Sequence, residues 1–120
     1  MKTNMRQRDV QFFVQDGCLV RTVSGTGGNG RTYTHRCLRK VFETVAHAID
    51  ETPMQGDGTT LMIISRQENL PFTQVNVALE FLKERGIVDV RHRRCYPGTT
   101  SVFEDAMVEF LALARDKAEG

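Results

Sequence analysis

The first quarter of the chain has the alternating pattern of β-strands. Apolar and polar residues alternate imperfectly on both sides of Asp16-Gly17. An Asp-Gly pair favours a two-residue hairpin turn, because both positions of that turn need a positive φ. We therefore predict a β-hairpin with strands at about 10–15 and 18–23, followed by a flexible glycine-rich connection over residues 24–30.

The apolar spacing then changes to three and four residues, which is typical of a helix with one buried face. Thr34 is a suitable N-cap for the first such helix, and the apolar stripe of this helix begins at Leu38. The helix is expected to end before Pro53.

Two further helices are predicted close together after this point. Thr60 is a suitable N-cap for a short second helix, and Asn69 suits the left-handed residue that ends it. Pro71 can open a third helix, because its missing N–H is not needed in the first turn. The third helix is expected to run to Gly86.

The period becomes two after Gly86, so we expect a strand over about 87–93. The Tyr-Pro-Gly-Thr segment at 96–99 has Pro and Gly at the central positions of a type II turn, which predicts a chain reversal and a short return strand. Ser101 and Glu104 have the spacing of a capping box, which predicts a fourth helix. Its apolar face is expected to be Phe103, Met107, Phe110, Leu111 and Ala114.

Over about 34–100, this order of elements and the register of the residues resemble bacterial winged-helix regulators of the multiple-antibiotic-resistance and related classes. The matching positions are Thr60, Leu61, Ile64, Leu70, Val75, Ala78, Leu79, Leu82, Glu84, Arg85, Gly86, Ile87 and Val88. The fold class is therefore expected to be α+β, a winged helix-turn-helix with an added N-terminal β-hairpin and a C-terminal helix. We expect the hairpin and glycine-rich loop (1–30) and the winged-helix domain (31–120) to form a single compact unit.

The resemblance implies a transcriptional regulator that binds double-stranded DNA sequence-specifically. It places the third helix, about 71–85, in the major groove and the basic wing, 91–100, on the phosphate backbone or in the minor groove. Gln74 and Asn76 can each make paired hydrogen bonds to adenine, whereas wing arginines neutralise phosphates. The residues implied to face DNA are Thr60, Phe72, Thr73, Gln74, Asn76, Val77, Arg91, Arg93, Arg94 and Tyr96.

The third helix also departs from a typical DNA-reading helix. It carries no exposed positive charge before Lys83, and Glu80 points to the DNA side or its edge. Phosphate neutralisation supplies most nonspecific affinity for DNA. The alternative is therefore a winged-helix protein–protein interaction module without DNA binding, which presents apolar surface of the third and fourth helices to a protein partner.

Surplus apolar residues favour a homodimer, unless the N-terminal hairpin covers them within one chain. These residues are Val77 and Phe81 on the third helix and Val108 and Leu113 on the fourth. A twofold dimer is expected to place two recognition helices roughly 34 Å apart, about one turn of DNA.

The distribution of charge and the cysteine content indicate where a polyanion could bind and in which compartment the protein is expected. Residues 1–40 carry eight Lys and Arg against two Asp, a net charge of +6, whereas residues 41–90 have a net charge of −5. A polyanion would therefore meet the first third or the arginines at 91–94. Three widely spaced cysteines do not suit a disulfide framework, which favours a cytoplasmic location. The longest apolar run has five residues, so neither a membrane span nor a secretory signal is expected.

Other chemistries are weakly indicated. The glycines at 25–30 match a dinucleotide-binding pattern, but a hairpin precedes them and a helix follows, so no cofactor is expected. His35, Cys37, His92 and Cys95 suit zinc only if two distant segments converge, so no metal is expected. No nucleophile stands in a catalytic motif, so the chain is not expected to be an enzyme. An exposed Cys95 beside two arginines would have a lowered pKa and could sense oxidants.

Overall fold

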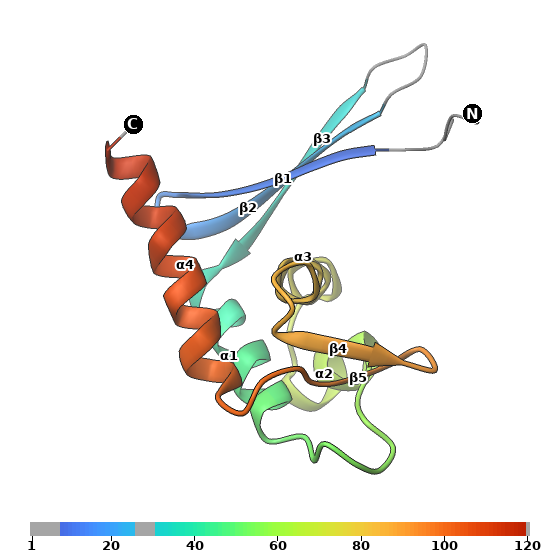
Figure 1. Ribbon diagram of the computed structural model, residues 1–120. Helices are drawn as coiled ribbons and strands as arrows, with labels where there is room; N and C mark the ends of the chain where they lie inside the picture. Colours follow the sequence, from blue (N-terminus) through green and yellow to red (C-terminus); the bar gives the residue numbers. More distant parts are fainter. Residues whose placement is uncertain (1–7, 26–30, 120) are drawn as a thin grey trace, which may run out of the picture.

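The computed structural model describes residues 8–25 and 31–119, and these residues form an α+β fold with four helices and two small antiparallel sheets (Figure 1). The elements are β1 (Arg8–Gln15), β2 (Cys18–Gly25), β3 (Thr32–Leu38), α1 (Arg39–Asp50), α2 (Leu61–Glu68), α3 (Phe72–Glu84), β4 (Val88–Arg91), β5 (Arg94–Pro97) and α4 (Val102–Glu119). Within the described ranges, no helix combines the length and the hydropathy that a membrane crossing requires.

The predicted N-terminal hairpin is confirmed. Asp16 and Gly17 form its two-residue turn with φ of 53° and 76°, and Gln15 pairs with Cys18 across it. Residues 26–30 of the glycine-rich connection lie outside the described residues.

The hairpin gains a third strand that the sequence analysis missed. The segment after Thr34 was expected to be helical, but residues 32–38 pair antiparallel with β2 as strand β3, and α1 begins only at Arg39. The alternation along β3 explains the difference, because Cys37 is fully buried while Leu38 is 51% exposed. Pairing with β2 therefore determines the conformation of a segment whose local sequence also suits the start of a helix.

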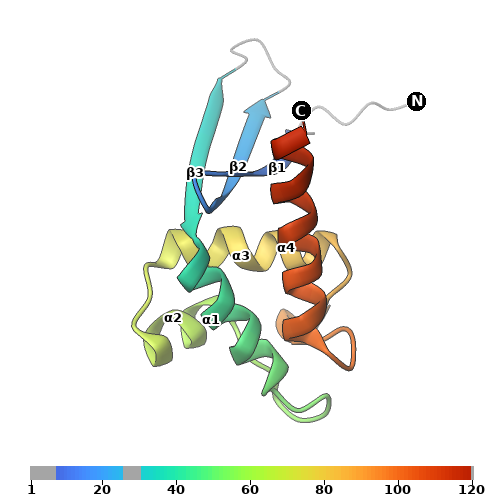
Figure 2. The same ribbon diagram turned by 90° about the vertical axis from the view of Figure 1, so that its left-hand side faces the viewer.

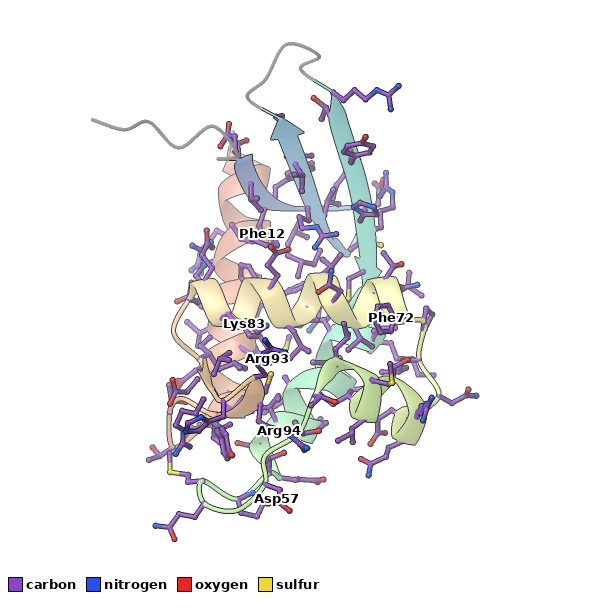
Figure 3. The ribbon with its side chains drawn as sticks, turned by 90° about the vertical axis from the view of Figure 1, so that its right-hand side faces the viewer. Phe12, Asp57, Phe72, Lys83, Arg93 and Arg94 are labelled. Carbon is purple, nitrogen blue, oxygen red and sulfur yellow. The ribbon has the colours of Figure 1, made fainter. Side chains whose placement is uncertain are left out.

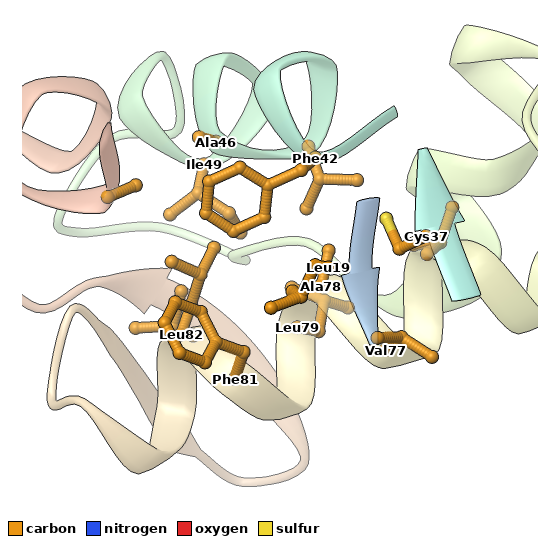
Figure 4. Close-up of a cluster of buried hydrophobic side chains, with 14 of the residues drawn as sticks. Leu19, Cys37, Phe42, Ala46, Ile49, Val77, Ala78, Leu79, Phe81 and Leu82 are labelled. Atoms are coloured by element: carbon orange, nitrogen blue, oxygen red, sulfur yellow. The ribbon is translucent and has the colours of Figure 1, made fainter. Parts of the chain in front are cut away.

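One hydrophobic core joins this sheet to the helices (Figure 4). The ring of Phe42 on α1 lies 5.9 Å from that of Phe81 on α3 and 5.1 Å from that of Phe110 on α4. Phe12 on β1 meets the other side of Phe81, with 5.2 Å between ring centroids. The N-terminal sheet therefore packs on the same core as α1, α3 and α4.

The predicted limits of α2 are confirmed. The Thr60 side chain accepts a hydrogen bond from the backbone N–H of Ile63 at 3.1 Å, which caps the helix start. Asn69 ends the helix in the left-handed conformation, with φ of 55°. Pro71 then precedes the first residue of α3.

The second sheet is a hairpin of β4 and β5, and its turn differs from the prediction. The chain reverses at His92 and Arg93, which both have positive φ (52° and 67°), instead of at 96–99. Residues 96 and 97 continue strand β5, so the expected return strand at 99–100 is wrong. Thr59 extends this sheet, since its N–H and C=O bond the backbone of Cys95 at 3.0 and 2.7 Å.

The fourth helix begins at the predicted place with different partners. The N–H of Ser101 donates to Thr99 Oγ1, and the N–H of Val102 donates to Asp50 Oδ1 at 3.0 Å, so residues outside the proposed capping box satisfy the start of α4. Leu111 was expected in the buried face but is 45% exposed. Leu113 packs against the core instead.

The helices α3 and α4 lie on opposite sides of the molecule. Figure 2 shows α4 and α1 toward the viewer, whereas Figure 3, from the reverse side, shows α3 in front. Each helix therefore presents a separate outer surface.

Candidate functional site

The outer face of α3 is a narrow polar strip. Phe72 is 52% exposed, Thr73 and Lys83 are exposed, and Asn76 and Glu80 are half-buried. One flank of this strip carries Val75, Ala78, Leu79 and Leu82, and the other carries Val77 and Phe81, all of which are buried in the core. At about 100° per residue these buried positions leave only a narrow stripe of α3 facing outward.

Two β-structures flank this strip. Figure 1 shows α3 nearly end-on between the β1–β3 sheet and the β4–β5 hairpin, and both extend to the same side of the molecule. The strip of α3 therefore lies between the three-stranded N-terminal sheet and the β4–β5 hairpin.

The first groove beside the strip lies toward the β4–β5 hairpin and has a volume of about 300 Å³. The start of α2, the outer face of α3 and the hairpin turn contribute to it. Its lining includes Thr60, Met62, Phe72, Asn76, Lys83 and Arg93. In the described part of the chain, neither Lys83 nor Arg93 has an ion-pair partner, so two free cations meet at this groove.

The second groove lies toward the N-terminal sheet and has a volume of about 310 Å³. Arg21 and His35 line it from the sheet, with Tyr33 further along β3, and Asn76 and Glu80 line it from α3. Asn76 belongs to both grooves and forms the ridge between them.

The acidic residue of the strip is neutralised within this second groove. The Arg21 guanidinium forms an ion pair and hydrogen bond with the carboxylate of Glu80 and donates a second hydrogen bond to His35 Nδ1 at 3.1 Å. The Arg21 side chain is 8% exposed. The negative charge that the sequence places near the outer face of α3 is therefore paired with a buried cation.

Two residues expected to face DNA contact the N-terminal sheet instead. Val77 is fully buried, and Gln74 Oε1 accepts a hydrogen bond from the N–H of Leu38 at 2.9 Å. Both positions follow from the unpredicted strand β3, which packs along this side of α3. These side chains are not part of the exposed strip.

Two residues of the expected basic wing are also occupied by contacts within the chain. The guanidinium of Arg91 lies 3.8 Å from the ring centroid of Tyr96 and donates to the carbonyl of Met54 at 2.9 Å. The Tyr96 hydroxyl donates to the carbonyl of Gly56 at 3.0 Å, and its side chain is buried. Arg91 and Tyr96 therefore fix the segment before α2 to the hairpin.

The remaining wing arginines point to different places. Arg93, in the hairpin turn, lines the groove beside α3, whereas the Cβ of Arg94 lies next to Gly58 in the segment before α2 (Figure 3). Arg94 pairs with Arg91 across the hairpin, and cross-strand partners share one face. Of the three wing arginines, Arg93 is the one that joins the strip of α3.

The thiol of Cys95 does not fit the expected redox sensor. Its side chain is buried, and this burial raises its pKa, with Lys83 acting in the opposite direction. Burial also raises the pKa of Cys37 to about 12. A raised pKa leaves a thiol protonated and unreactive at neutral pH, so the prediction of an exposed, activated Cys95 is wrong. Among residues 8–25 and 31–119, no three His, Cys, Asp or Glu side chains gather in a way that could hold a metal ion.

The sequence analysis missed the contribution of β3. Tyr33, His35 and Cys37 alternate with more polar residues, which was the available signal for a strand facing α3.

Comparisons of this chain with family models, with curated proteins and with solved structures find no match.

Proposed function

We propose that this chain is a winged-helix protein that binds double-stranded DNA, with α3 as the recognition helix and the β4–β5 hairpin as the wing. The succession of α1, the single bridge at Thr59, α2, α3 and the β4–β5 hairpin supports the winged-helix assignment. In such folds the recognition helix enters the major groove while the wing contacts the backbone.

The observation that carries the proposal is the groove between α2, α3 and Arg93. It brings one amide, that of Asn76, into the same groove as two free cations, those of Lys83 and Arg93. An amide can read adenine through paired hydrogen bonds, and cations hold the flanking phosphates. Thr73 and Phe72 complete the surface that would meet base edges.

The pairing of Glu80 removes an objection to this proposal. A free carboxylate on the outer face of α3 would repel phosphates, but Arg21 compensates its charge. Because Val77 and Phe81 are fully buried, Phe72 is the one large apolar side chain that α3 exposes, which leaves little apolar surface for a protein partner. The geometry therefore favours DNA over a protein partner at this face.

The test is fluorescence anisotropy against random-sequence duplex DNA. We expect binding that weakens roughly tenfold or more between roughly 50 and 200 mM salt, because log affinity falls by about 0.9 per phosphate contact for each unit of log salt. The double variant Lys83→Ala with Arg93→Ala should reduce both the affinity and the salt dependence. Arg93→Ala alone should already weaken binding. Arg94→Ala removes the same charge from another position of the same hairpin, so it is the matched control for Arg93→Ala and should have a smaller effect.

Absence of binding at low salt would contradict the proposal and favour the protein-interaction alternative. Equal losses for Arg93→Ala and Arg94→Ala would show that only net charge matters. Thermal unfolding of each variant, followed by circular dichroism, checks that the fold is retained.

A further inference from the structure

The outer face of α4 carries an apolar pair between two opposite charges. Val108 is 62% exposed and Leu111 is 45% exposed. Glu104 lies one turn before Val108, and Arg115 lies one turn after Leu111, and both are exposed. The steps between these four residues are four, three and four, which is the spacing of one seam on a helix that packs against another helix.

The charges at the two ends of this seam have no partner among the described residues. Neither Glu104 nor Arg115 forms an ion pair there, whereas the nearby Glu109 pairs with Arg85 at 3.4 Å. Glu109 is turned toward α3, so it is not part of the outer seam. The seam is thus exposed, with both of its charges free.

The seam is complementary to itself in one orientation only. Glu104 and Arg115 lie at equal distances from the midpoint between residues 109 and 110, and so do Val108 and Leu111. When two copies of α4 pack antiparallel about a twofold axis at this midpoint, Glu104 of each copy faces Arg115 of the other. Val108 then faces Leu111 of the second copy, whereas a parallel arrangement would oppose like charges.

We propose that α4 of one copy packs antiparallel on α4 of a second copy, and that this dimer joins two DNA duplexes. The second half rests on the DNA binding proposed above. Because the outer face of α4 is opposite to α3 (Figures 2 and 3), a twofold axis through the α4 seam directs the two α3 surfaces away from each other. The sequence analysis expected a dimer with both recognition helices on one duplex. The α4 dimer proposed here places them on two different duplexes instead.

The pairing is tested by the dimer dissociation constant in analytical ultracentrifugation. One helix pair is a small interface, so we expect dissociation in the micromolar range. Glu104→Lys and Arg115→Glu should each weaken the dimer roughly tenfold, because each change places like charges opposite one another twice. The double variant should restore the dissociation constant to within about threefold of the unchanged protein. A monomeric mass at about 100 µM protein, or a double variant no better than the single ones, would overturn the pairing.

The bridging is tested with two duplexes. A biotinylated duplex on streptavidin beads should capture a fluorescent duplex at low salt when the protein is added. The variant Val108→Glu with Leu111→Glu should bind one duplex with unchanged anisotropy but capture no second duplex. Capture that persists in this variant overturns the proposal.

The two proposals fail in different ways. If the protein dimerises through α4 but binds no duplex in anisotropy, the DNA-binding proposal fails and bridging fails with it. If one duplex binds while the protein stays monomeric, the α4 pairing fails and DNA binding stands.

Discussion

Arg21 connects the N-terminal sheet to the outer face of α3. Its guanidinium contacts both Glu80 and His35, while its Nε is buried without a hydrogen-bond partner among the described residues. Burying a cation is costly unless it is paired, so the carboxylate of Glu80 is needed to hold Arg21 in place. The contact is therefore a structural link, and it also means that Glu80 is not a free negative charge on the outer face of α3.

This link is testable through the free energy of unfolding in urea. Arg21→Met should destabilise the protein by about 1–3 kcal/mol, because the half-buried carboxylate loses its partner. Glu80→Met should cost a similar amount by leaving the buried guanidinium unpaired. The double variant should lose less than the sum of the two, because it leaves no unpaired charge. Strict additivity would mean that the two side chains are not coupled.

At the scale of elements, β3 forms the second wall beside α3. Tyr33 is 52% exposed and lines the groove with Asn76, and Arg31 precedes the strand without an ion-pair partner among the described residues. Thr34 and Arg36 occupy the alternate positions of the strand, where side chains point to the other face of the sheet. The two faces of one strand thus provide a matched pair of test surfaces.

If DNA lies between the N-terminal sheet and the β4–β5 hairpin, substitutions on the two faces of β3 should differ in their effect on DNA affinity. Arg31→Ala with Tyr33→Ala should weaken duplex binding and lower the slope of log affinity against log salt by about 0.9, the value for one phosphate contact. Arg36→Ala with Thr34→Ala removes the same charge from the outer face and should leave the slope unchanged. The anisotropy titrations described above measure both. If both double variants keep the slope of log affinity against log salt of the unchanged protein, the inner face of β3 does not contact DNA. The DNA surface is then restricted to α3 and the β4–β5 hairpin.

The elements also show which features the sequence can predict. The turn at Asp16-Gly17, the cap at Thr60 and the end of α2 at Asn69 depend on a few adjacent residues, and all three were predicted. Strand β3 depends on pairing with β2, and the β4–β5 turn uses two non-glycine residues at positive φ, so local signals pointed elsewhere.

Errors in the candidate site have the same origin. Thr60, Asn76 and Arg93 were named from the sequence and do line one groove. Val77 was named for the same surface, but the strand that buries it was not foreseen. A helical register gives the direction of a side chain, whereas what covers that side chain depends on contacts between distant segments.

At the scale of the whole molecule, four aromatic rings join the N-terminal sheet to three helices. Phe12, Phe81, Phe42 and Phe110 contact one another in series, with neighbouring centroids 5.2, 5.9 and 5.1 Å apart. The sheet and the helices therefore share one core, and the chain should unfold in a single transition.

Phe12→Ala tests this cooperativity, because it removes the ring by which β1 contacts α3. We expect a loss of about 2 kcal/mol in the free energy of unfolding, since the ring is only partly buried and its edge contact with Phe81 is lost. In this variant, the helix signal in circular dichroism and the hydrogen exchange of the β2 amides should still give one common unfolding midpoint. That midpoint should lie at a lower denaturant concentration than in the unchanged protein. If the β2 amides exchange freely while α1 stays protected, the sheet is a separate folding unit, and its position against α3 is not maintained by the common core.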